Sequence, residues 1–277
     1  NLPDTINVHG FLTVNGEKMS KSRGTFLNAS EFLPLCEPEH LRYYYASNLT
    51  RQMADLNLDI EDYKERINNE LVSNVANFFY RVLSFCNKNF DSETLPAEDG
   101  FLKRFEFSHI IQDYRNLEFR NAAKQILAAS ADGNKYFQEN APWKLIKTDR
   151  AKAQLVVSNS VNLVRDVNIL LKPILPEFTK KIEAQLNLKD SDFGALGKNL
   201  GQHKIGTAEI IFKNIGKPEL KAKDPFSNFD LRVAEVKSCK SHPNADKLIV
   251  LGLDLGKGEE RTICAGIRPY YTEEEMV

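Results

Sequence analysis

The feature that most constrains the fold is a long helical pattern that begins at Asp59 and continues to about Asn89. Asp59 is a favourable N-cap residue, and Glu61 and Asp62 place negative charge in the first turn, where the helix dipole stabilises it. At 1.5 Å per residue such a helix would be about 45 Å long. Its mixed polar and apolar faces predict that it packs against other helices.

Further helical patterns follow after short breaks, with predicted joints at Gly133, at the "NAPW" turn and at Pro173. Several helices with short connections predict an antiparallel bundle. Before the bundle we expect a short helix around Pro38–Ser47, in which Tyr43–Tyr45 pack inside the protein, and then a loop, "RQMADLNL". The helices predicted after the long one lie at about 99–115, 118–139, 149–171 and 176–187.

The two ends of the chain have a different pattern. Near the start, "VHGFLTVNG" is apolar and includes Asn15-Gly16, a hairpin-turn signal. After Leu188 the sequence is Gly-rich and irregular, with one predicted strand at Ala208–Phe212 and then a linker. From Phe229 onward, "DLRVAEVKSC", "KLIVLGLDLG" and "ERTICAGI" predict short strands of a small β-barrel. This stretch is too short to close a barrel, and the chain does not start with Met. We therefore interpret the chain as a piece of a longer protein.

These patterns predict a mainly α protein, in which an antiparallel helical bundle precedes a partial β-barrel. The predicted parts are a terminal segment at 1–30, a connecting helix and loop at 31–58, the helical bundle at 59–190, an irregular segment and linker at 191–226, and the partial barrel at 227–277.

Composition excludes several classes of protein. The net charge of −1 argues against a protein that coats nucleic acid without sequence specificity, which needs a broadly basic surface. Local basic sites are compatible with this net charge. The four cysteines form no CxxC pair, so we predict no metal site in this chain. There is neither a long apolar run nor a signal peptide, which predicts a soluble cytoplasmic protein without membrane contact.

The stretch "EKMSKSRGT" concentrates cations and small polar residues near the start of the chain. Lys18 and Lys21 lie three residues apart, and lysine ammonium groups act as point charges for phosphate oxygens. Backbone N–H groups near Gly24 could add further donors. A solvated, charged turn is the alternative, and composition alone does not decide between the two.

Two further features could read nucleic-acid bases. On the long helix a polar stripe includes Glu70, Ser73, Asn74, Asn77 and Arg81; the last two lie four residues apart, so that an amide and a guanidinium are adjacent. A plain solvent-exposed face is the alternative. The single tryptophan, in "NAPWKL", follows a proline at a helix joint, where it could stack on an unpaired base or fill the core.

The sequence resembles the bacterial methionyl-tRNA synthetases over nearly its whole length. "HGFLTVNGEKMSKSRGTF" is similar to the end of their Rossmann-type catalytic domain, with the K-M-S-K-S loop of class I aminoacyl-tRNA synthetases. The helical region resembles their anticodon-binding domain. "FDLRVAEVKSCKSHPNADKLIVLGLDLGKGEERTICAGIR" resembles their appended tRNA-binding domain. The resemblance implies a methionine–tRNA ligase that uses ATP, and an OB-like fold for the partial barrel.

The resemblance also implies roles for single residues. Lys18 and Lys21 would bind ATP, and Lys21 would be catalytic because it steadies the triphosphate charge in the transition state. Asn77 and Arg81 would contact the first anticodon base. Trp143, supported by Pro142, would stack on that base. Where the family often has a further asparagine this chain has Ser73, next to Asn74.

Partners follow from the same resemblance. The expected partner is methionine tRNA with its CAU anticodon, which the last domain would grip without reading the anticodon; Lys237, Lys240 and Lys247 are its candidate phosphate contacts. That domain would also join two copies into a homodimer. The remaining alternatives are a class I synthetase for Ile, Val, Leu or Cys, and a non-catalytic tRNA-binding scaffold. Because the family's upstream catalytic motifs are not in this sequence, we expect the chain alone to bind tRNA without charging it.

The role implied for Lys21 can be tested in an enzyme that carries this loop beside a complete catalytic domain. There, Lys21→Ala should lower the rate of adenylation far more than the affinity for tRNA, because the lost cation acts on the leaving pyrophosphate in the transition state. Pyrophosphate exchange measures the rate, and filter binding measures the affinity. A normal exchange rate would rule out this role.

Overall fold

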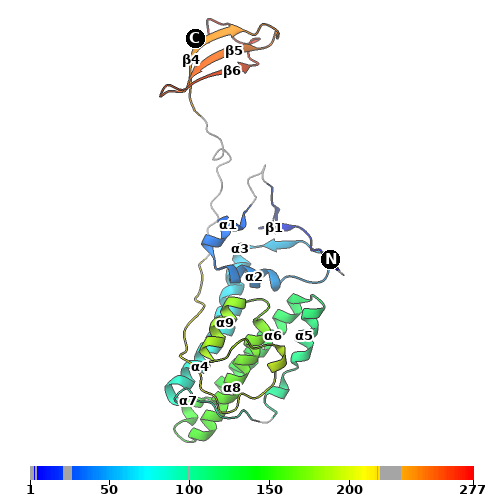
Figure 1. The fold of residues 1–277 in the computed structure, drawn as a ribbon, viewed down its shortest axis with the longest axis vertical. Helices are drawn as coiled ribbons and strands as arrows, with labels where there is room; N and C mark the ends of the chain where they lie inside the picture. The colour runs from blue at the N-terminus through cyan, green and yellow to red at the C-terminus, as the bar shows by residue number, and fades with distance from the viewer. Residues whose placement is uncertain (1–2, 4, 21–26, 99, 217, 219–231) are drawn as a thin grey trace. The chain divides into compact units, whose positions relative to one another are not determined.

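The computed structural model describes residues 3, 5–20, 27–98, 100–216, 218 and 232–277. The chain forms two compact units, Asn1–Lys221 and Ala222–Val277. A helical bundle makes up most of the first unit, and a three-stranded sheet makes up the second (Figure 1). The prediction of a mainly α protein with a helical bundle is confirmed.

The first unit begins with a small sheet. Strand β1 (Leu12–Val14) pairs antiparallel with β2 (Glu17–Lys18) and parallel with β3 (Leu56–Leu58). Asn15 and Gly16 have φ values of 48° and 81°, the conformation of a type I′ turn, so the predicted hairpin turn is confirmed. Strand β3 lies in the stretch that was predicted to be a loop. Its three residues are too few to show the alternation by which a strand is recognised.

A short helix, α2 (Pro38–Ala46), follows α1 (Ala29–Phe32) and the 3-10 turn η1 (Leu33–Leu35) and packs against the bundle before the chain returns to β3. Tyr43 and Tyr44 are fully buried, as predicted. Both carboxylate oxygens of Glu39 accept hydrogen bonds, each of 2.7 Å, from the first backbone N–H groups of α9 (Pro176–Gln185). Since a helix N-terminus has four unpaired N–H groups, Glu39 acts as its cap from a distant part of the chain. Its partial burial raises the pKa of this carboxyl group.

The long helix extends from Ile60 to Asn89, as predicted. Asp59 caps it, because its Oδ1 accepts hydrogen bonds from the N–H groups of Glu61 and Asp62 at 2.9 and 3.0 Å. Only the two ends are α-helical. The ten central residues form a π-helix, which the sequence did not predict, with i→i+5 hydrogen bonds. In order, the segments are α3 (Ile60–Arg66), the π-helix η2 (Ile67–Ala76) and α4 (Asn77–Asn89).

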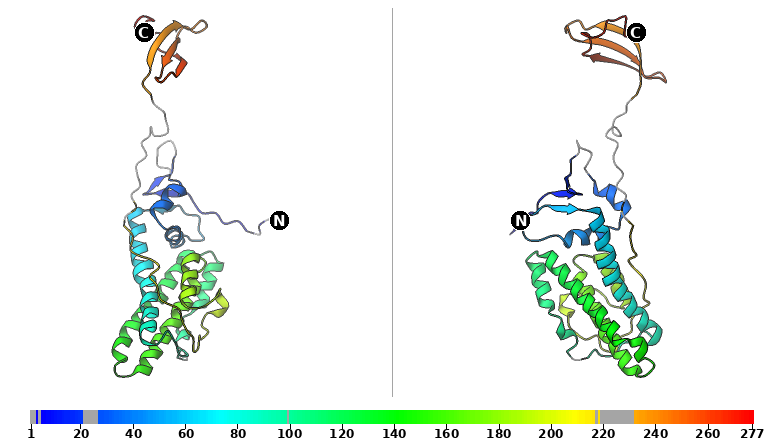
Figure 2. Two further views of the ribbon diagram at one scale, coloured as in Figure 1. Left: turned by 60° about the vertical axis from the view of Figure 1, so that its left-hand side comes forward. Right: turned by 180° about the vertical axis from the view of Figure 1, so that it is seen from behind.

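The remaining helices complete the bundle and follow the predicted order (Figure 2). The first of them begins later than predicted. The joint predicted at Gly133 is wrong, because Gly133 lies inside a continuous helix. The segments are η3 (Leu102–Arg104), α5 (Phe107–Arg115), α6 (Phe119–Asn140), α7 (Pro142–Leu145) and α8 (Arg150–Leu171).

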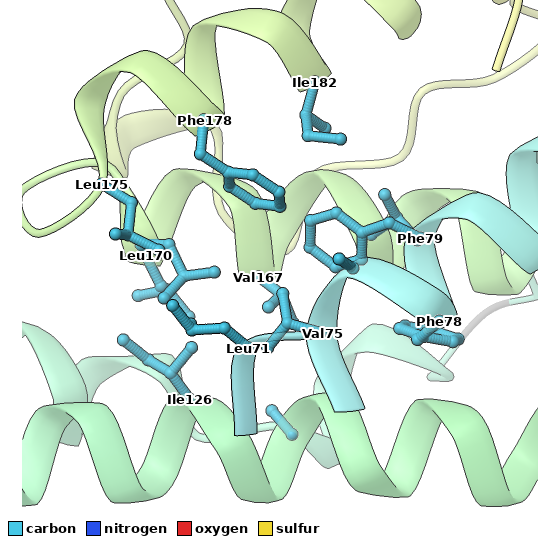
Figure 3. Packing of buried hydrophobic residues seen from close by; sticks show 14 of the residues in the cluster. Leu71, Val75, Phe78, Phe79, Ile126, Val167, Leu170, Leu175, Phe178 and Ile182 are labelled. Carbon is cyan, nitrogen blue, oxygen red and sulfur yellow. The ribbon is translucent and has the colours of Figure 1, made fainter. Parts of the chain in front are cut away.

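The core forms around α8, in which every residue from Val156 to Leu171 is buried. Figure 3 shows apolar side chains from the long helix, α6, α8 and α9 in contact. Phe79 and Phe178 stack with ring centroids 5.9 Å apart. The polar residues in the α8 sequence "NSVNLVRDVN" are buried with hydrogen-bond partners: Asn159 accepts from the Glu98 N–H, Asn162 accepts from the Leu200 N–H, and Arg165 pairs with Asp166.

An extended segment, residues 199–216, which we call the strap, lies along the bundle and has no helix or strand except one bridge between Glu93 and Lys204. The strand predicted at Ala208–Phe212 is therefore wrong. Side-chain amides take the place of a partner strand: Gln185 both donates to the carbonyl and accepts from the N–H of Glu209. Two further pairings of this kind involve Asn68 with Ile215, and Asn87 with Gly206 and Ala208. In the reverse arrangement, the side chain of Asn199 in the strap pairs with the backbone of Ala97.

The second unit is an antiparallel meander. Strands β4 (Glu235–Ser241), β5 (Ile249–Asp254) and β6 (Glu260–Ala265) pair in that order, and they match the three strands predicted from alternation. Within these strands, Ile249 and Leu251 are the buried residues.

None of the helices in the described ranges combines the length and the apolar character needed to cross a bilayer.

Gly133 lies at a close crossing of α6 with α4 and α8. A Cβ atom there would lie 2.5 Å from the Phe78 ring and 2.7 Å from a Leu163 methyl group, and both side chains are fully buried. Gly133→Ala should therefore destabilise the protein by about 1–3 kcal/mol through overpacking, offset by up to about 1 kcal/mol of helix propensity. Chemical denaturation measures the sum.

Ala131→Gly is the matched control, because Ala131 is exposed on the same helix. It should cost about 1 kcal/mol from propensity alone. A Gly133→Ala variant that is more stable than the parent would contradict the close crossing.

Candidate nucleic-acid interface

The polar stripe predicted on the long helix is divided by the π-helix. Offsets of 100° per residue do not apply to i→i+5 turns, so the residues before Asn77 lie elsewhere than predicted. Glu70 accepts a 2.7 Å hydrogen bond from the Tyr43 hydroxyl group. Asn74 turns toward α6 and donates to the Leu127 carbonyl at 3.0 Å. Asn74 is therefore a packing residue, whereas Ser73 is exposed.

Asn77 and Arg81 lie where the chain has returned to α-helix. The Asn77 N–H still bonds the Val72 carbonyl, the last i→i+5 bond, and Arg81 follows one α-helical turn later. The Asn77 side chain is exposed, and within the described ranges its amide makes no hydrogen bond. The two side chains therefore present several donors and one acceptor on the same face of α4.

Two amides of α6 hold the Arg81 guanidinium. Its Nη1 donates to Asn134 Oδ1 at 3.3 Å, and its Nη2 donates to Gln138 Oε1 at 2.9 Å. The guanidinium carbon lies 5.7 Å from the ring centroid of Phe137. In the part of the chain that the structure describes, no carboxylate forms an ion pair with Arg81. Its charge is oriented but not neutralised, which suits an anionic or electron-rich partner.

Trp143 lies on α7, directly after the C-terminus of α6. Ala141, which ends α6, has a left-handed conformation with φ of 40°, and Pro142 then fixes the first residue of α7. The ring of Trp143 is half-buried and lies 6.0 Å from the ring of Phe137, centroid to centroid. Its burial lies between the two alternatives from the sequence, an accessible stacking platform and a core residue, whereas Pro142 is buried.

Phe137 brings the predicted residues together, since Arg81 and Trp143 both contact its buried ring. The resulting surface combines an exposed amide, an oriented guanidinium and part of an indole ring. These are the groups that proteins use to stack and hydrogen-bond unpaired RNA bases. Sequence reasoning missed Asn134, Phe137 and Gln138, although their i, i+3, i+4 spacing on α6 is visible in the sequence.

The predicted phosphate loop is only partly described. Lys18 lies in β2, and its Nζ is 4.2 Å from the ring centroid of Phe11. Lys21 lies outside the described residues.

The three lysines predicted to contact phosphate in the second unit differ in their surroundings. Lys237 forms a 2.8 Å ion pair with Glu235, so part of its charge is already compensated. Lys240 and Lys247 lie on or near β4 and β5, both at the surface.

Comparison with known families assigns each part of the chain. Residues 1–83 match the family model described as "tRNA synthetases class I (M)". Residues 101–223 match the "Anticodon binding domain of methionyl tRNA ligase" and residues 231–277 a "Putative tRNA binding domain". The chain belongs to the methionyl-tRNA synthetase family. It carries the anticodon-binding and tRNA-binding domains of that family, and the prediction made from the sequence is confirmed.

Solved structures of methionyl-tRNA synthetase from Mycobacterium tuberculosis are similar to this chain. The enzyme in complex with methionyl-adenylate has 26% identity and a TM-score of 0.66, over 71% of this chain and 41% of that one. The apo form has 23% identity and a TM-score of 0.69, over 79% and 45%. At this lower identity, the similarity to the apo form shows only that the two chains share the fold. The chain therefore spans less than half the length of the synthetases it matches.

The half-buried Trp143 makes a fluorescence test possible, because it is the only tryptophan. Its emission should change, and iodide quenching should fall, when an RNA stem-loop with a CAU anticodon is added. Trp143→Ala should weaken binding of that RNA by about 1–3 kcal/mol through lost stacking. Trp143→Phe should retain much of the affinity.

The stability of the same variants provides the control. Since the ring is only half-buried, Trp143→Ala should cost less than the roughly 3–5 kcal/mol of a truncated core tryptophan. Emission that responds neither to iodide nor to RNA would instead place Trp143 among the core residues.

Proposed function

We propose that this chain recognises the CAU anticodon of methionine tRNA as part of an ATP-dependent methionine–tRNA ligase. One observation carries the proposal: Arg81 is oriented by two neutral amides, without a carboxylate partner in the described ranges, beside an exposed Asn77 and a half-buried Trp143. The guanidinium is thus held in place while its charge stays available to an RNA base.

The proposed roles follow from the chemistry of the three side chains. An anticodon base is unpaired, so its Watson–Crick edge and its ring face are both accessible. Arg81 donates to the acceptors of the first anticodon base, and Asn77 supplies both a donor and an acceptor. Trp143 stacks on the ring face, with Pro142 fixing the position of the indole.

The other proposed roles belong to the longer enzyme. Lys18 and Lys21 would bind the ATP phosphates, with Lys21 acting in the transition state, and the C-terminal unit would grip tRNA and join two copies of the enzyme. A cytoplasmic location agrees with the family. The match to the methionyl anticodon-binding domain favours this reading over a synthetase for Ile, Val, Leu or Cys, and over a non-catalytic scaffold.

Base discrimination tests the anticodon site. Asn77→Ala and Arg81→Ala should each weaken binding of a CAU stem-loop by roughly 1–3 kcal/mol, the value of a lost base-edge contact. The loss should be much smaller for a stem-loop with a different first anticodon base. Fluorescence titration of both RNAs measures the difference.

Lys88→Ala is a suitable control, because Lys88 is an exposed cation about two turns further along the same helix. It should reduce affinity for both stem-loops equally, if at all. Equal losses on the two RNAs for Arg81→Ala would mean that Arg81 contacts phosphate, and the proposed site would be withdrawn.

A further inference from the structure

One side chain of α6 contacts both sides of the change from π-helix to α-helix. Asn134 donates through Nδ2 to the carbonyl oxygen of Asn74, in η2, at 3.1 Å. Through Oδ1 it accepts from Arg81, in α4, at 3.3 Å. A single amide therefore connects the backbone of the π-helix to the guanidinium proposed to read the anticodon.

The two bonds constrain different properties. The bond to Asn74 fixes how far the long helix is rotated where the α-helix resumes, and so the direction in which Asn77 and Arg81 project. The bond to Arg81 fixes the orientation of its guanidinium group. Because the Asn134 amide has partners at both ends, it loses little further freedom when a base binds, and the site is preorganised.

Two neighbouring residues of α6 each make only one of the two hydrogen bonds that Asn134 makes. Ser130, which is fully buried, donates to the same Asn74 carbonyl at 3.4 Å and does not contact Arg81. Gln138, which is exposed, bonds Arg81 at 2.9 Å and does not contact the π-helix. The two therefore allow the contributions of Asn134 to be separated experimentally.

We propose that Asn134 is a positioning residue for recognition of the first anticodon base, through Arg81 and through the rotation of the helix that carries it. This inference rests on the proposed function of Arg81. Asn134 itself need not touch the RNA.

The experiment compares stem-loops that differ only in the first anticodon base, using the whole chain. Asn134→Ala should lower the affinity for the CAU stem-loop about tenfold, the scale of one lost hydrogen bond to a charged group. The affinity for the changed stem-loop should stay within about twofold, so discrimination falls. Ser130→Ala and Gln138→Ala, which each remove one task, should each reduce discrimination less than Asn134→Ala.

A double variant distinguishes positioning from general destabilisation. Arg81→Ala combined with Asn134→Ala should lose clearly less discrimination than the sum of the two single losses, because Asn134 acts largely through Arg81. Losses that add, or equal losses on both stem-loops, would overturn the inference. Should Asn134→Ala unfold, as circular dichroism would show, Asn134→Ser replaces it, because a hydroxyl cannot reach both partners.

The same data separate the two proposals. If Arg81→Ala leaves discrimination unchanged, the proposed function of Arg81 fails. If Arg81→Ala abolishes discrimination while Asn134→Ala and Asn134→Ser retain it, only the positioning role fails.

Discussion

The close crossing of α6 at Gly133 is the contact on which the candidate site depends. A glycine at this point lets the backbone of α6 approach Phe78 on α4 and Leu163 on α8. The next residues of α6 then lie near α4, so that Asn134 and Gln138 reach Arg81. A larger residue would separate the helices. The hydrogen bonds from Arg81 to these side-chain amides, about 3 Å long, would not tolerate such a shift. Packing at one glycine thus sets the geometry of a polar surface beside it.

Side-chain amides solve a second problem, that of backbone groups outside regular structure. Buried N–H and C=O groups need partners, and neither the strap nor the π-helix supplies all of its own. Asn68, Asn87 and Gln185 each donate to one strap carbonyl and accept from one strap N–H, as a neighbouring strand would. Asn134 donates to one carbonyl group of the π-helix, while its oxygen accepts from the Arg81 side chain. These residues explain how asparagine and glutamine side chains contribute to the bundle without lying in regular strands.

Local signals made much of the fold predictable. The Asp59 cap, the Asn15-Gly16 turn and the alternating strands of the second unit each depend on neighbouring residues, and the sequence located them. Gly133 was misread because a glycine inside a helical pattern is compatible with a break or with a close contact, and only the facing helix decides. The π-helix and the strap depend on contacts across more than fifty residues, as between Asn74 and Asn134. The resemblance proposed Asn77, Arg81 and Trp143, but not Asn134, Phe137 and Gln138 of α6, which contact Arg81 or Trp143.

The arrangement at the end of α6 is costly to the fold. Ala141 adopts a left-handed conformation, which costs about 1–2 kcal/mol for a residue with a Cβ atom, and Trp143 leaves part of a large ring accessible. Arg81 gains neutral partners where a carboxylate would have stabilised it more. Arg81 and Trp143 lie beside a closely packed helix crossing, and both contact Phe137. A surface that offers an amide, an oriented guanidinium and part of an indole ring can present hydrogen-bonding groups and a ring face together, as the proposed role in base recognition requires.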